Sequence, residues 1–166
     1  MLIALLSDSH DSVPNLRAVL ELLAPHQPNV YLHLGDLCSP DLLELFAGLP
    51  KNAFHFVLGN GDYDRSAAHA SAVRWGFVCH GRHGSLALAD RRVAFLHGDD
   101  HGLLHQLIAS QEYDYVLHGH THRWADTREG KTRIINPGAL YRAPVKTVAL
   151  LDVGTDKLMR LALPEP

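Results

Sequence analysis

Residues 2–10 read LIALLSDSH, an apolar run that ends abruptly in polar side chains. A short continuous apolar run is typical of a strand buried on both faces, so we predict a strand over 2–6. The residues that follow contain Pro14 and then apolar side chains at i, i+3, i+4 and i+7, which predicts a helix with one apolar face. That face consists of Leu16, Val19, Leu20 and Leu23.

The alternation of strand and helix continues toward residue 60. Apolar runs at 30–34 and 53–58 predict two further strands, and Ser39-Pro40 predicts the start of a second helix between them. Strands that alternate with helices in this way are expected to be parallel and joined by right-handed crossovers.

The pattern changes beyond residue 60. Residues 61–75 read as irregular loop, and the next helix is predicted over 102–111. Further strands are predicted at 77–79, 85–89, 93–96, 115–117, 132–135, 145–152 and 157–163. We therefore expect an α/β domain whose mixed sheet is extended by antiparallel strands.

Composition narrows the class of protein. The chain has 166 residues, 46% of them hydrophobic, which fits a single domain over residues 1–166. A net charge of −3 argues against a protein whose main activity is to bind the backbone of nucleic acids. The two cysteines, Cys38 and Cys79, form no disulfide or zinc-binding pattern. The sequence shows no signal peptide, and none of its apolar stretches approaches the ~20 residues of a membrane span. We therefore expect a cytoplasmic protein.

The unusual feature of the composition is its 13 histidines, which are spread along the chain. Histidine is the commonest metal ligand and the usual acid–base group near neutral pH. Several of them stand directly after predicted strands, together with Asp and Asn. These strand-end segments are Ser7-Asp8-Ser9-His10, Gly35-Asp36, Gly59-Asn60-Gly61-Asp62, His97-Gly98-Asp99 and His118-Gly119-His120-Thr121-His122. Ligands bind beyond the carboxyl ends of parallel strands, so these segments are expected to meet in one cleft.

The residue types in this set suit divalent metal ions. Asp, Asn and His supply oxygen and nitrogen ligands for manganese, iron or zinc. Asp8 and His10 are two residues apart, as are His120 and His122, so in extended backbone each pair would project to one side. Two metal ions about 3.5–4 Å apart can clamp both oxygens of an in-line displacement at phosphorus.

The order of these motifs resembles the calcineurin-like metallophosphoesterase superfamily. Any one motif is weak, but the whole ordered set is specific, and it runs from residue 8 to residue 138. The short chain and Asn136-Pro137-Gly138 are similar to the small bacterial and archaeal phosphodiesterase branch of that superfamily.

The resemblance implies a fold and a site. The fold would be a four-layer αββα sandwich, two mixed sheets flanked by helices. Asp36 would bridge two metal ions, and Asp36, Asn60 and His97 would carry catalysis. The first metal would be held by Asp8, His10 and His122, and the second by Asn60, His97 and His120. A metal-activated water would attack phosphorus.

Two positions depart from the family pattern. Many members have a histidine after the asparagine of the third motif, where it is thought to protonate the leaving group, but this chain has Gly61. Losing a general acid typically costs about 10²–10⁴-fold, so we expect esters with good leaving groups to react faster. The other departure is Asp99-Asp100-His101 after His97-Gly98, where the branch often has histidine next and His101 could fill that place after a shift of one residue.

Two alternatives to a phosphodiesterase stay open at this point. One is a phosphomonoesterase, including a phosphoprotein phosphatase, and the other is a non-catalytic scaffold like the retromer subunit of the same fold. The chain is short for the insertions of larger phosphatases, and it lacks no ligand of the family set. Manganese is the favoured metal, although iron, zinc or nickel also fit the ligands. The expected partner is a small phosphodiester or nucleotide-like substrate rather than long nucleic acid or a membrane, and base rates favour a homodimer.

Other polar residues have competing interpretations. Arg65, Arg123 and Arg142 lie near the motifs and could bind a substrate phosphate, but exposed basic residues are equally common. Cys38 could line the cleft, although a small core residue is the favoured interpretation. Asp62 could support Asn60, orient a water, or only shape a turn. Among the remaining histidines, His33 is expected to be packed and hydrogen-bonded, and His118 to support the site. His101 and His105 are expected to lie on the surface of a helix. The others are expected to be surface or loop residues: His26, His55, His69, His80 and His83.

Overall fold

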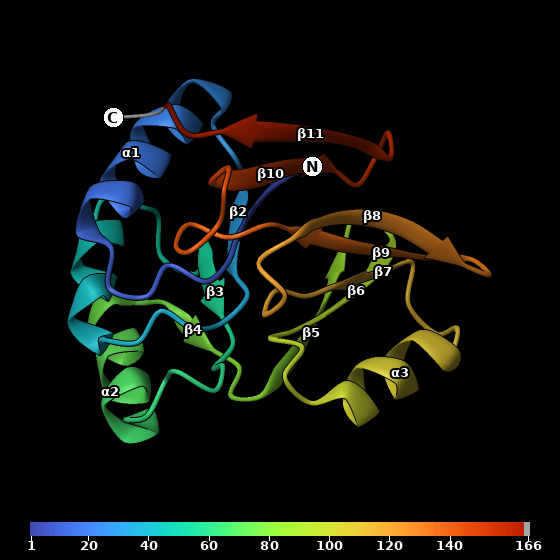
Figure 1. The fold of residues 1–166 in the computed structure, drawn as a ribbon, viewed down its shortest axis with the longest axis horizontal. Coiled ribbons are helices and arrows are strands. Elements are labelled where there is room, and N and C mark those ends of the chain that lie inside the picture. The colour runs from blue at the N-terminus through green and yellow to red at the C-terminus, as the bar shows by residue number, and fades with distance from the viewer. Residues whose placement is uncertain (165–166) are drawn as a thin grey trace.

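A computed structural model describes residues 1–164, and the last two residues of the predicted domain, 165–166, lie outside the described residues. The chain forms two mixed β-sheets (Figure 1). The first sheet has six strands in the order β11-β10-β1-β2-β3-β4. Their bounds are Lys157–Ala162, Thr147–Asp152, Leu2–Leu6, Val30–His33, Phe54–Phe56 and Val78–Cys79, respectively.

The second sheet has five strands in the order β5-β6-β7-β9-β8. Their bounds are His83–Leu88, Arg91–Leu96, Tyr115–Leu117, Thr132–Pro137 and Trp124–Glu129, respectively. β1 to β4 are parallel neighbours in the first sheet, and β6, β7 and β9 are parallel neighbours in the second. The antiparallel strands lie at the outer parts of both sheets, as expected from the change of pattern along the chain.

Helices cover the outer faces of the two sheets (Figure 1). The first sheet is covered by α1 (Val13–Leu23), α2 (Arg65–Trp75) and the 3₁₀ helix η2 (Pro40–Phe46), while a short 3₁₀ turn η1 (Ala24–His26) follows α1. The second sheet is covered by α3 (His101–Ala109). α1 begins with a proline in its first turn, where the missing N–H costs no helical hydrogen bond.

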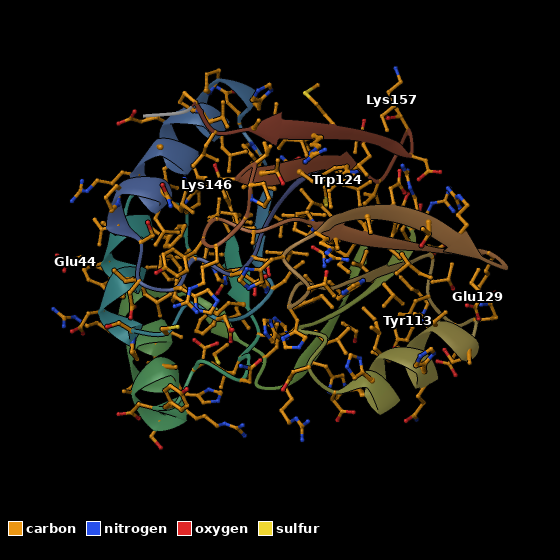
Figure 2. The ribbon with its side chains drawn as sticks, viewed as in Figure 1. Glu44, Tyr113, Trp124, Glu129, Lys146 and Lys157 are labelled. Atoms are coloured by element: carbon orange, nitrogen blue, oxygen red, sulfur yellow. The ribbon has the colours of Figure 1, made fainter. Side chains whose placement is uncertain are left out.

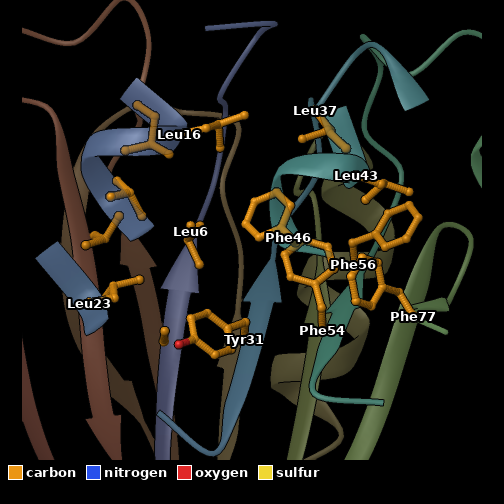
Figure 3. Packing of buried hydrophobic residues seen from close by; sticks show 14 of the residues in the cluster. Leu6, Leu16, Leu23, Tyr31, Leu37, Leu43, Phe46, Phe54, Phe56 and Phe77 are labelled. Carbon is orange, nitrogen blue, oxygen red and sulfur yellow. The ribbon is translucent and has the colours of Figure 1, made fainter. Parts of the chain in front are cut away.

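Three apolar clusters hold these layers together. Along β1, Ala4 and Leu6 face the helices, whereas Ile3 and Leu5 face the second sheet, because successive side chains of a strand point to opposite faces. Phenylalanines of β3, η2 and the segment before β4 fill the layer between the first sheet and its helices (Figure 3). A third cluster joins α3 to the second sheet. This arrangement confirms the predicted four-layer sandwich.

The two sheets are also joined by polar and aromatic contacts. The guanidinium of Arg133 in β9 and the hydroxyl of Tyr115 in β7 both donate to the carboxylate of Asp156, which lies in the turn between β10 and β11. Trp124, labelled in Figure 2, lies under the guanidinium of Arg160 from β11, which is 5.2 Å from its ring centre. These contacts join the β10–β11 hairpin of the first sheet to the second sheet.

Two sequence predictions of local structure were wrong. Residues 61–75 are not irregular, because α2 occupies residues 65–75; it was missed because its buried side chains are only Ala68 and Ala72. The helix predicted to start at Ser39-Pro40 is present, as the 3₁₀ helix η2. The strand β8 was not predicted, because its side chains from Asp126 onward are exposed and polar, as suits the edge of a sheet.

Within residues 1–164, none of the helices is long and apolar enough to cross a membrane.

Candidate metal centre

The predicted cleft forms where parallel strands end. Asp8 follows β1, Asp36 follows β2, His97 follows β6, and His120 and His122 follow β7, so ligands from both sheets meet at one edge of the sandwich. Two groups of side chains come close enough for each to hold a metal ion. One consists of Asp8, His10 and His122, and the other of Asp8, Asp36 and His97.

The two carboxylates lie between the histidines. One oxygen of Asp36 is 3.5 Å from Nε2 of His10, and its other oxygen is 3.5 Å from Nε2 of His97. Oδ1 of Asp8 is 3.2 Å from Nε2 of His122 and 4.0 Å from Nε2 of both His10 and His97. A carboxylate with one oxygen toward each of two histidines has the geometry that a bridging ligand needs.

Several of these atoms are buried without a hydrogen-bond partner. Among the described residues they include Oδ1 of Asp8 and the Nε2 atoms of His10 and His97, all of which face the same space. Buried polar atoms are nearly always paired, so atoms left unpaired in one cluster call for an explanation. A divalent cation would satisfy the carboxylate oxygens and the imidazole nitrogens together, so the donor set fits a metal ion.

Hydrogen bonds orient His97 for this role. Its Nδ1–H donates to the carbonyl of Leu34 at 2.8 Å, which leaves Nε2 pointing at the carboxylates. Burial alone would lower the pKa of His97, but the Asp36 and Asp8 carboxylates outweigh it and raise that pKa to about 9. Burial likewise opposes ionisation of Asp36, yet His97 and the Gly61 N–H hold its pKa at about 2. The negative field that attracts a proton here would attract a metal cation.

Two predicted ligands lie farther from this cluster. The ring centre of His120 is 5.0 Å from that of His97, and the His120 backbone N–H donates to Oδ2 of Asp8. Asn60 is exposed and lies beside His10 at the rim. Their assignment as ligands of a second metal therefore stays a prediction.

The backbone at the ligands is left-handed rather than extended. Positive φ values occur at Asp8 (53°), His10 (41°), Asp36 (56°), His120 (66°) and His122 (57°). The extended backbone assumed for the two pairs was therefore wrong, although Asp8 and His10 do point into the same group, as predicted. Non-glycine residues rarely adopt this region, and they cluster in it at functional sites.

Asp62 joins two of the ligand loops. Its carboxylate is buried and accepts hydrogen bonds from the backbone N–H groups of Asp36, Cys38 and Gly59. The loop after β2 and the loop after β3 are thereby held at a fixed separation. The open question about Asp62 is thus answered: it supports the site rather than only shaping a turn.

Asn136 plays a matching role for the histidines after β7. Its fully buried amide donates to the Gly119 carbonyl at 2.8 Å and to the Thr121 hydroxyl at 3.0 Å, while its oxygen accepts from the Gly138 N–H. The loop that carries His120 and His122 is therefore pinned to the end of β9.

Replacing Asn136 by alanine is expected to weaken metal binding by about 10–100-fold, because partners that orient ligands contribute on this scale. The dissociation constant for manganese, measured by competition with a chelator, checks this. Asn29→Ala serves as a control, since it removes an exposed asparagine contact to the Leu2 N–H away from the site. Equal manganese affinities in the two variants would contradict the assigned role.

The histidines outside the cluster only partly match their predicted roles. His33 is fully buried and its Nε2 lies 3.0 Å from the Ser9 hydroxyl, as predicted for a packed, hydrogen-bonded residue. His101 and His105 are exposed on α3, and the ring of His101 lies 6.4 Å from that of His120. Exposure was also predicted correctly at His26, His69 and His83.

His55 and His80 were predicted to be surface or loop residues. His80 does lie in the loop between β4 and β5, whereas His55 lies in β3, and both rings are half-buried and paired. Nδ1 of His55 is 3.0 Å from Nε2 of His80, and His55 Nε2–H donates to the Asn52 carbonyl. A neutral His55 therefore accepts from His80. Burial, with the neighbouring His55, lowers the pKa of His80 to about 4.

The His80 environment predicts a pH effect on stability. Its folded-state pKa of about 4 lies below the usual value of 6.5, so the unfolded chain binds the proton first as the pH falls. The free energy of unfolding should decrease between pH 6.5 and 4, and His80→Gln should reduce that decrease. Urea unfolding at pH 7 and pH 5 measures both, with the exposed His83→Gln as control; parallel pH profiles for the wild type and His80→Gln would disprove the effect.

A groove adjoins the cluster on the side of His10. Its volume is ≈ 460 Å³, and Cys38, Asn60, Tyr63 and Arg142 contribute to its lining. Of the two interpretations of Cys38, the core residue was wrong and the cleft-lining residue agrees with the structure: Cys38 is half-buried, and its Sγ lies 3.6 Å from Nδ1 of His10. Burial, together with nearby carboxylates, raises the pKa of Cys38 to about 12, so the thiol stays neutral.

Sequence reasoning missed the aromatic residues at this groove. Tyr63 lies three residues past Asn60 in the same loop, and the ring of Tyr141 lies 5.5 Å from that of His10. The position of Tyr63 after a ligand motif was the signal that could have identified it.

The sequence is similar to proteins of a known family. A family model described as the calcineurin-like phosphoesterase superfamily domain matches residues 1–156. The chain is 26% identical over 172 residues to the phosphodiesterase MJ0936 of Methanocaldococcus jannaschii, an alignment that covers 98% of this chain and 99% of that protein.

Solved structures show the same fold. That of a novel archaeal phosphodiesterase matches with a TM-score of 0.91 at 26% identity, covering 98% of this chain and 100% of the other. The E. coli phosphoesterase YfcE and the zinc complex of Vps29 from Entamoeba histolytica match with TM-scores of 0.69 and 0.70, each at 19% identity and covering 99% of this chain and 100% of theirs. At that identity these two share the fold alone.

Proposed function

The chain belongs to the calcineurin-like phosphoesterase superfamily, and we propose that it hydrolyses phosphodiesters with the help of two divalent metal ions. The observation that carries this proposal is the convergence of unpaired carboxylate and imidazole atoms from Asp8, His10 and His97 on one space. The similarity to a curated phosphodiesterase over nearly the whole chain supports the choice of a diester.

We assign the ligands as the resemblance implies. Asp8, His10 and His122 would hold the first metal, which agrees with one of the two close groups. Asn60, His97 and His120 would hold the second, and Asp36, with one oxygen toward His10 and the other toward His97, would bridge the two. When bound, the metal ions would activate a water and neutralise charge on the phosphoryl oxygens.

The protein's own contribution is orientation and proton control. The Leu34 carbonyl fixes the ring of His97, and Asp62 and Asn136 fix the loops that carry the other ligands. No side chain is available at Gly61 to protonate a leaving group, and the neutral Cys38 thiol beside it is a weak acid. Esters whose leaving group departs as a stable anion should therefore react fastest.

The finer features of the function follow from the same proposal. Manganese is the favoured metal, with iron, zinc and nickel as alternatives for the same nitrogen and oxygen ligands. The substrate would be a small phosphodiester or a nucleotide-like molecule. We further propose that residues 1–166 act as one domain, as a homodimer, in the cytoplasm.

The test is hydrolysis of bis(4-nitrophenyl) phosphate by chelator-treated protein, before and after manganese is added. Activity should be absent after chelation and return with the metal, and 4-nitrophenyl phosphate, a monoester, should be the poorer substrate. A folded protein that stays inactive with manganese, iron, zinc and nickel would contradict the proposal and favour a scaffold.

A further inference from the structure

Tyr63 is unusually exposed for an aromatic residue beside a reactive site. Its side chain is 90% exposed, so the ring contributes almost nothing to packing of the folded chain. It nevertheless lines the groove next to His10 and Asn60. An aromatic ring held in this position presents a flat apolar face to whatever enters the groove, and such faces stack on other planar rings.

Arg142 supplies positive charge to the same groove. It is exposed, its guanidinium lies 5.3 Å from the ring centre of Tyr141, and no carboxylate among residues 1–164 lies within ion-pair distance of it. Asp11 lines the groove too, but its carboxylate accepts the Ser39 N–H. Arg142 therefore keeps its hydrogen-bond donors available for an anion.

The two residues together define a chemical class of ligand. The unpaired guanidinium can bind one negative charge, and the free tyrosine ring can bind a planar group. Both side chains line the same groove of ≈ 460 Å³, which lies next to the ligand cluster. A phosphodiester carries one negative charge on phosphorus and one or two organic groups. The match points to a diester in which at least one organic group contains a ring.

We propose that Tyr63 and Arg142 make this protein selective for phosphodiesters bearing an aromatic or heteroaromatic group, with the ring stacked on Tyr63 and the charged phosphoryl group paired with Arg142. The inference rests on the proposed function, because it takes the diester to be bound at the adjacent cluster. Tyr63 then discriminates between organic groups, whereas Arg142 recognises the charge that all phosphodiesters share.

Binding of two diesters whose leaving groups are poorer than 4-nitrophenolate separates these roles. Diphenyl phosphate has planar rings and diethyl phosphate has none, and both carry the same charge. Calorimetric titration of the manganese-loaded wild type should give an affinity for diphenyl phosphate about tenfold higher than for diethyl phosphate. Tyr63→Ala should abolish that preference and Tyr63→Phe should keep it, while Arg142→Ala should weaken both ligands by a similar factor.

Matched controls are available on the exposed surface. Val73→Ala removes an apolar side chain that is 81% exposed on α2, and Arg74→Ala removes an exposed guanidinium beside it. Neither should change the ratio of the two affinities. Because Tyr63 and Arg142 are both exposed, thermal unfolding of their variants should match that of the wild type.

The outcomes distinguish this inference from the proposed function. If the wild type hydrolyses bis(4-nitrophenyl) phosphate with manganese but Tyr63→Ala keeps the full preference for diphenyl phosphate, the groove assignment is overturned and the phosphodiesterase stands. If the wild type shows no metal-dependent hydrolysis, the proposed function fails first. Ring-proton signals of diphenyl phosphate in saturation-transfer NMR, present with the wild type and lost with Tyr63→Ala, give a second readout independent of turnover.

Discussion

Replacing Asp36 by asparagine is expected to lower kcat/KM for bis(4-nitrophenyl) phosphate by about 10³-fold, a loss typical of removing one group that stabilises transition-state charge. The side chain keeps its shape but loses the charge that lies 3.5 Å from both His10 and His97. Its Oδ1 can still accept the Gly61 N–H, so the loop should keep its conformation. Steady-state kinetics and the manganese content of the purified variant measure the effect.

A control substitution separates the effect of losing a carboxylate in the metal centre from the effect of losing a negative charge elsewhere on the protein. Asp90→Asn removes an exposed carboxylate in the turn between β5 and β6, and it should leave kcat/KM unchanged. His97→Ala should reproduce the loss seen in Asp36→Asn. If Asp36→Asn kept wild-type activity at full manganese content, Asp36 would not be a bridging ligand.

The second large effect is expected from Gly119→Ala. A Cβ at this position would lie 1.9 Å from the Ser7 hydroxyl and 2.8 Å from Oδ2 of Asp8, both of which are buried. Overpacking of this kind typically costs about 1–3 kcal/mol, and the close contacts with buried side-chain atoms place this case at the upper end. Urea unfolding should show the loss, and displacement of Asp8 should also weaken manganese binding.

A glycine elsewhere provides the comparison. Gly48→Ala introduces a Cβ with no heavy atom within 4 Å, so its free energy of unfolding should stay near that of the wild type. Adding Ser7→Ala to Gly119→Ala removes the closest atom and should recover part of the loss, giving non-additive energies. Additive energies would show that the steric explanation is wrong.

The family resemblance implied the four layers, whereas the residue pattern itself predicted the strands and the polar cluster at their ends, for a physical reason. β1, β2 and the strand over 115–117 have continuous apolar runs because they are buried on both faces, and the polar residues after them stand out. The carboxyl ends of parallel strands lie at one edge of a sheet. Predicting these strands therefore also predicted that Asp8, Asp36 and His97, which follow them, lie close together, as they do in the structure.

Elements with weak burial could not be predicted this way. α2 packs through small alanines and exposes Val73, so the apolar periodicity of a helix is nearly absent even though Asp64 and Gly76 mark its ends. β8 has an exposed polar run at a sheet edge. Sequence reasoning also missed contacts that depend on tertiary structure, including the three N–H bonds to Asp62 and the pairing of His55 with His80.

The left-handed backbone at the ligands has a consequence for how such a protein can be changed. Residues held in this region cost about 1–3 kcal/mol each, and glycine or asparagine would relieve that cost at His10, His120 or His122. A directed-evolution screen for heat resistance alone, run without metal, would therefore favour substitutions that remove the imidazole groups of these residues. Engineering this chain for higher stability should keep metal in the selection, or confine mutations to the helices and outer strands.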